Sequence, residues 1–143
     1  METTKKQKRI FLVIAILALI WNLIGVLNFI GTAFMRETLA ESYTPAETEL
    51  FLALPAWYLI FFGIATMAGL FASITMLMHK KSTVLLFLIS LLAVLVTQAY
   101  WLLGTNIMEV MGTVALIMPI VVIVIAIFLY LYSKRAQKRG LLH

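Results

Sequence analysis

The sequence contains no cysteine and only two histidines among its 143 residues. Without cysteine the chain has no disulfide, no thiolate nucleophile and no iron–sulfur ligand set, and two histidines leave almost no route to a zinc site. Aspartate is absent as well, so that glutamate is the only acidic residue type. The residues that usually carry catalysis are therefore scarce. The sequence predicts no enzyme, no metal site and no cofactor.

Charged residues are few and apolar residues are many. The chain has 12% charged and 64% hydrophobic residues, whereas soluble domains have about 25% and about 45–50%. A soluble globule of this length could not bury so much apolar surface. The composition predicts an all-α integral membrane protein, with a single domain over residues 1–143.

Four apolar segments are each long enough to cross a ~30 Å hydrocarbon layer as a helix. They cover about residues 10–31, 56–78, 84–103 and 111–132. Short links favour an antiparallel up-down four-helix transmembrane bundle. In the first link, Thr44-Pro45-Ala46-Glu47 has the pattern of a helix start, so we expect a short interfacial helix on the outer side over about residues 45–53.

The positions of the basic residues predict the orientation. Ten of the eleven Lys and Arg residues lie before the first span, in the Lys80–Lys81 turn or after the fourth span, and five of the six glutamates lie in the other links. By the positive-inside rule, this pattern predicts a multi-pass protein of the bacterial inner membrane with both termini in the cytoplasm. It also explains the net charge of +5 without a nucleic-acid partner, and the lipid bilayer is the expected partner.

Small residues mark the faces that should pack against other helices. In the first span, Ala15, Ala18, Asn22 and Gly25 recur at steps of three and four, and Ala65, Gly69 and Ser73 do so in the second at steps of four. Such spacing places small side chains on one helix face, where a neighbouring backbone can approach closely. We expect Asn22 on the inward face, because an amide that faces lipid would lose its water partners.

Four side chains, one from each span, reach a similar depth of roughly 20 Å when they are counted from the basic ends at ~1.5 Å per residue: Asn22, Thr66, Gln98 and Pro119. Pro119 lacks an N–H and should leave the carbonyl of Ala115 free and kink the fourth helix. We expect this polar layer to line a ligand pocket that opens outward, with further residues around it: Trp21, Asn28, Trp57, Tyr100 and Trp101. Alternatively, the layer only supplies hydrogen bonds between helices, each worth about 0.6 kcal/mol.

The stretch AGLFASITMLMHKKSTVLLFLISLLAVLV leads from a helix rich in small residues through a basic turn into another apolar helix. Together with the four spans in a chain of 143 residues, this stretch resembles the bacterial DoxX-like membrane proteins. The resemblance covers mainly residues 63–98. The chain also resembles small bacterial proteins that are automatically labelled "sugar transporter". The acidic residue typical of the DoxX-like second helix is absent, since Thr66, Met67 and Ala68 occupy that neighbourhood. The resemblance therefore carries over no catalytic residue.

These patterns favour a non-enzymatic membrane protein that binds or passes a small neutral or lipid-like molecule, alone or as a homo-oligomer. No Arg, Lys or Glu lies in the middle of a span, so charge-coupled transport lacks its usual side chains. Two alternatives stay open. The protein is an accessory subunit that packs against another membrane protein, or it is a quinone-linked redox helper, as the DoxX-like resemblance implies.

Overall fold

The computed structural model describes residues 4–34, 44–45, 49, 52–105, 107, 109 and 112–143. Most of this part belongs to four long helices: α1 (Lys5–Phe34), α4 (Ala56–Leu77), α5 (Ser82–Ala99) and α7 (Ile117–Lys138). A π-helix, η1 (Tyr100–Gly104), continues α5, and a 3-10 helix, η2 (Gly112–Leu116), leads into α7. No strand occurs within the described residues, so the predicted all-α fold is confirmed. The predicted interfacial helix falls mostly outside them.

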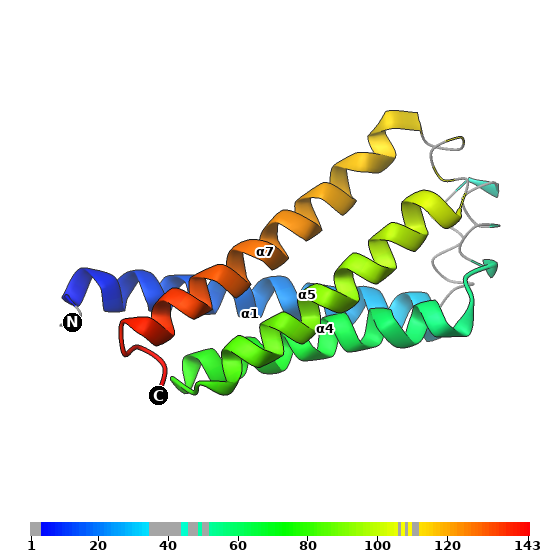
Figure 1. Cartoon of the computed structure of the whole chain (residues 1–143). Coiled ribbons are helices and arrows are strands. Elements are labelled where there is room, and N and C mark those ends of the chain that lie inside the picture. The colour runs from blue at the N-terminus through cyan, green and yellow to red at the C-terminus, as the bar shows by residue number, and fades with distance from the viewer. Residues whose placement is uncertain are drawn as a thin grey trace.

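The four long helices run alternately up and down, with both termini at one end of the bundle (Figure 1). Each helix is long and apolar enough to cross a membrane, with α5 and η1 counted together and η2 and α7 counted together. We call the end that holds the termini and the turn between α4 and α5 the basic end, because Lys5, Lys80 and Lys138 lie there. The opposite end is called the open end.

The helices extend beyond the predicted spans where polar residues follow apolar ones. The first span was predicted from residue 10, but α1 begins at Lys5, and α7 continues to Lys138, six residues past the predicted limit. Hydropathy marks only the stretch that fits hydrocarbon, whereas the backbone hydrogen bonds of a helix continue into water. The second span agrees with α4 to within one residue.

Small residues form the inward faces, as their spacing predicts. Ala15, Ala18 and Asn22 are buried in α1, and Ala65, Gly69 and Ser73 are buried in α4. Large apolar side chains point outward instead, and Leu27 on α1 is 67% exposed. This reversal of the usual soluble pattern suits a helix bundle whose surroundings are apolar.

The main core lies at the basic end and joins all four helices. Its buried residues include Phe11 of α1, Met76 of α4, Phe87 of α5 and Leu129 of α7. The chain after α7 covers this core at the basic end, because Leu141 and Leu142 are buried in it. Gly140 makes this possible, since its left-handed φ of 78° turns the chain back toward the bundle. The basic end is thus tightly packed.

Candidate functional site

A cavity of about 390 Å³ lies above this core and faces the open end. The helices pack in series, α1 with α4, α4 with α5, and α5 with α7, whereas α1 and α7 make few backbone contacts in the described residues. At the basic end the rings of Phe11 and Tyr132 join α1 to α7, with their centroids 6.4 Å apart. Toward the open end α7 leans away from α1 (Figure 1). The cavity fills the space that this divergence leaves among the four helices.

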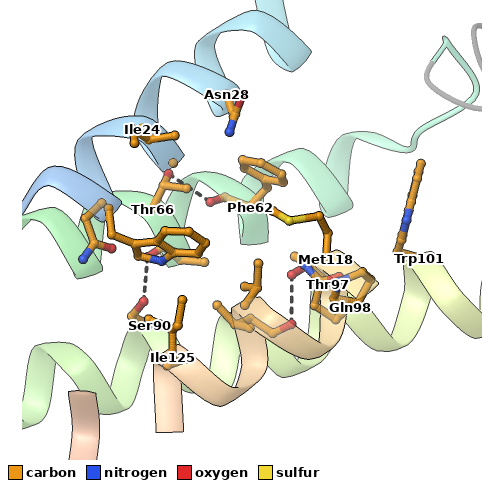
Figure 2. Close-up of a pocket in the computed structure, with 18 of the residues that line it drawn as sticks. Ile24, Asn28, Phe62, Thr66, Ser90, Thr97, Gln98, Trp101, Met118 and Ile125 are labelled. Atoms are coloured by element: carbon orange, nitrogen blue, oxygen red, sulfur yellow. Dashed lines mark hydrogen bonds between the residues drawn. The ribbon is translucent and has the colours of Figure 1, made fainter. Parts of the chain in front are cut away.

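Seven of the nine predicted site residues line this cavity: Trp21, Asn22, Asn28, Thr66, Gln98, Trp101 and Pro119. They come from all four helices and from η1, and Figure 2 shows Asn28, Thr66 and Gln98 around the same space. The structure therefore brings these seven residues together around one cavity. Whether a ligand occupies it remains a prediction.

The other two predicted residues, Trp57 and Tyr100, do not line the cavity in the structure. Their rings pack edge to face, with centroids 4.8 Å apart, and Trp57 is 43% exposed. Tyr58 lines the cavity instead. Neighbouring residues of a helix point about 100° apart, so only one of Trp57 and Tyr58 faces inward. The sequence shows the aromatic pair but does not distinguish its inward member.

The side chain of Asn22 joins α1 to α4. Its Nδ2 donates to the carbonyl oxygen of Ala18 at 2.8 Å and to Oγ of Ser73 at 3.1 Å. Ser73 donates in turn to the carbonyl oxygen of Gly69 at 2.9 Å. Part of the predicted role of Asn22 as an interhelical hydrogen-bonding residue is therefore present, but its partner is Ser73 and not Thr66 or Gln98.

The four predicted polar residues do not form one layer. Asn22 lies over Gly69, whereas Thr66 lies opposite Gly25, one helical turn closer to the open end. Within the described residues the side chain of Gln98 makes no hydrogen bond. Counting from the basic residues fails here because the helices begin at different heights. The polar groups instead follow the cavity wall over successive turns.

Three hydroxyl groups complete the polar lining. Thr66 donates to the carbonyl oxygen of Phe62 at 3.1 Å, Ser90 to that of Ala65 at 2.7 Å, and Thr97 to that of Val94 at 3.0 Å (Figure 2). Each hydroxyl group thus donates its hydrogen within the protein, and its oxygen can still accept a hydrogen bond from another donor. The sequence places Ser90 and Thr97 on the inward stripe of the third span, but only as small residues.

Pro119 is buried and lines the cavity, but it is the third residue of α7. A proline in the first turn of a helix is tolerated, because the N–H groups there have no partner within the helix. Pro119 therefore lies at the start of α7 and does not interrupt it, in contrast to the kink that we expected in the fourth helix. The backbone changes geometry before Pro119, where the 3-10 helix η2 ends at Leu116.

The chain matches no protein-family model, and neither a curated protein nor a solved structure is significantly similar to it. The resemblance to DoxX-like proteins and to proteins labelled "sugar transporter" thus stays a prediction. The cavity has to be interpreted from its own chemistry.

The lining is apolar apart from neutral polar groups. Among the described residues, no Lys, Arg, Glu or His lines the cavity. No group of three potential metal ligands occurs in this part of the chain. A charged ligand would lose its hydration here without a compensating charge. The cavity therefore suits a neutral molecule that is mostly apolar and has a few polar atoms.

The bond between Asn22 and Ser73 predicts a measurable coupling. In a double-mutant cycle of Asn22→Leu and Ser73→Ala, we expect a coupling energy of about 0.6 kcal/mol and no more than about 1.7 kcal/mol. Reversible unfolding in detergent measures it. The matched cycle of Asn22→Leu and Gln98→Leu should be additive, because these side chains share no hydrogen bond. A larger coupling to Gln98 than to Ser73 would contradict this assignment.

Proposed function

We propose that the protein is a multi-pass protein of the bacterial inner membrane that binds a small, neutral, lipid-like molecule in the cavity. The membrane location is supported by four apolar helices whose large side chains face outward. Both termini lie at the basic end, which the positive-inside rule assigns to the cytoplasm. The cavity then opens toward the outer side of the membrane.

The cavity itself is the observation that carries this function. Its volume of about 390 Å³ falls in the range of small-molecule sites. Its walls include Phe62, Val94 and Leu129, and its polar groups are amides and hydroxyls. A dry, uncharged site of this kind binds an apolar body and orients it through a few hydrogen bonds.

The route into the cavity also favours a lipid-like ligand. Because α1 and α7 have few contacts with each other, the bundle is least closed between these two helices. In a membrane this side faces acyl chains. A lipid-like molecule enters there directly from the bilayer, whereas a sugar would have to leave water first.

Tryptophan fluorescence tests this proposal in lipid nanodiscs. Trp21 and Trp101 line the cavity and Trp57 does not. In the Trp57→Phe variant, a long-chain alcohol with bromine atoms on its chain should quench fluorescence saturably as it occupies the cavity. The matched control, Trp21→Phe with Trp101→Phe, keeps only Trp57 and should show the unsaturable quenching of molecules dissolved in the bilayer. Identical curves for the two variants would exclude the site and favour an accessory subunit.

The orientation has a separate test, which the absence of cysteine makes simple. Glu109, in the link between η1 and η2, is exposed, and Lys138 is exposed at the end of α7. In intact cells with a permeable outer membrane, a membrane-impermeant maleimide should label Glu109→Cys. It should label Lys138→Cys only after the inner membrane is broken. The reverse pattern would overturn the cytoplasmic placement of the termini.

A further inference from the structure

The hydrogen bonds of Asn22 fix which end of its amide faces the cavity. The Ser73 hydroxyl gives its hydrogen to the carbonyl oxygen of Gly69, and the carbonyl oxygen of Ala18 can only accept. Both groups therefore require the NH₂ end of Asn22 as their donor. Flipping the amide would place its oxygen against the carbonyl oxygen of Ala18, and Ser73 could donate to that oxygen only by giving up its bond to Gly69. The oxygen Oδ1 is thus held away from these bonds.

This Oδ1 atom accepts no hydrogen bond within the described residues, although Asn22 is only 9% exposed. Every fully buried side-chain nitrogen or oxygen in the same residues has a partner. Oδ1 is therefore not fully buried, and Asn22 is one of the residues that line the cavity. A buried amide oxygen without a donor is unfavourable, so this position favours a ligand that supplies one.

A second acceptor lies beside the first, over the same glycine. A methyl group on Gly69 would overlap Asn22 Oδ1 and would lie 3.3 Å from Ser90 Oγ. The Ser90 hydroxyl hydrogen is already given to the carbonyl oxygen of Ala65 at 2.7 Å, so this oxygen too can only accept. Two acceptors therefore lie close together beside Gly69, where the absence of a side chain makes room for the amide oxygen of Asn22 itself.

From this geometry we propose that the cavity selects neutral amphiphiles whose polar end is a hydrogen-bond donor, an alcohol or a phenol. The hydroxyl group of the ligand binds on the cavity side of these two residues and donates to Asn22 Oδ1 or Ser90 Oγ. Its apolar body lies along the cavity walls, which Phe87 and Val94 help to form. Ethers, esters and ketones offer acceptors only, and they would place oxygen against oxygen. This specificity rests on the proposed function, since it concerns the same cavity.

A matched ligand pair tests the donor requirement. The brominated long-chain alcohol is compared with its methyl ether, which has the same chain but no donor, by saturable quenching in the Trp57→Phe variant in nanodiscs. We expect the alcohol to bind about tenfold more tightly than the ether, which corresponds to one hydrogen bond in a dry site. Equal binding, or tighter binding of the ether, would overturn the donor requirement and leave the proposed function standing. Saturable binding of neither molecule would overturn both.

Variants in the Trp57→Phe background locate the acceptors. Asn22→Leu and Ser90→Ala should each reduce the preference for the alcohol, and Ser90→Ala provides the result if Asn22→Leu does not fold. The control Gln98→Leu removes a polar group of the same cavity that is not near Gly69, and the preference should remain. If Gln98→Leu removes the preference and the other two variants retain it, the acceptor pair over Gly69 is not the binding site.

Discussion

Gly69→Ala should both destabilise the bundle and remove ligand binding. An added methyl group would overlap the amide of Asn22, which two hydrogen bonds hold in place. Overpacking of this kind costs about 1–3 kcal/mol, and it outweighs the better helix propensity of alanine, worth about 1 kcal/mol. The methyl group would also displace Asn22 Oδ1, the proposed acceptor, and would lie 3.3 Å from Ser90 Oγ. Unfolding in detergent and quenching by the brominated alcohol measure the two effects.

Gly25→Ala is the matched control for this substitution. Gly25 lies on α1 and faces α4, but an added methyl group there would lie 3.4 Å from the Thr66 methyl group, an ordinary contact. This variant should be as stable as the native protein or slightly more stable, by up to about 1 kcal/mol from helix propensity. If both variants behave alike, the close approach of Asn22 to Gly69 does not determine the packing of α1 on α4.

The inward faces are predictable from the sequence because close helix packing requires small side chains at regular steps. Ala15, Ala18 and Asn22 follow that spacing, and all three are buried. Ser90 and Thr97 have the same spacing and are buried as well. The spacing therefore also predicts that these two polar residues face the interior of the bundle. The spacing does not give the position of one helix relative to another along the bundle axis. Asn22 contacts Gly69 and Ser73, and a count of residues from the lysines does not predict which residues of α1 and α4 lie at the same level.

The core at the basic end, on which the cavity lies, could not be predicted in full, because part of it comes from residues that follow a charged segment. Leu141 and Leu142 come after the basic run that ends at Arg139, and hydropathy places them outside the bundle. The left-handed Gly140 returns them to the core, where the carbonyl oxygen of Leu141 lies 2.8 Å from Nδ1 of His79. Only the three-dimensional path of the chain brings these residues together.

Phe11, in the core at the basic end, joins α1 to the turn after α4 and to α7. It is 2% exposed, and its ring stacks on His79, with centroids 5.0 Å apart, and on Tyr132 of α7. Elsewhere α1 and α7 have few contacts with each other. Phe11 therefore connects α1 to α7 at the basic end, and we expect it to limit how far α7 leans away from α1.

Phe11→Ala should consequently have the largest effect on stability of any substitution considered, about 3–5 kcal/mol in reversible unfolding, because it leaves a cavity where four helices meet. The neighbouring Leu12 is a close control, since it is apolar but 51% exposed, and Leu12→Ala should lower the free energy of unfolding far less in detergent.

Hydrogen exchange tests whether Phe11 also fixes the position of α7. If Phe11 holds α7 against α1, its removal should speed hydrogen exchange at the basic end of α7 more than in α4, which packs against both α1 and α5. Uniformly faster exchange in all four helices would mean that Phe11 contributes packing volume alone and does not fix the position of α7.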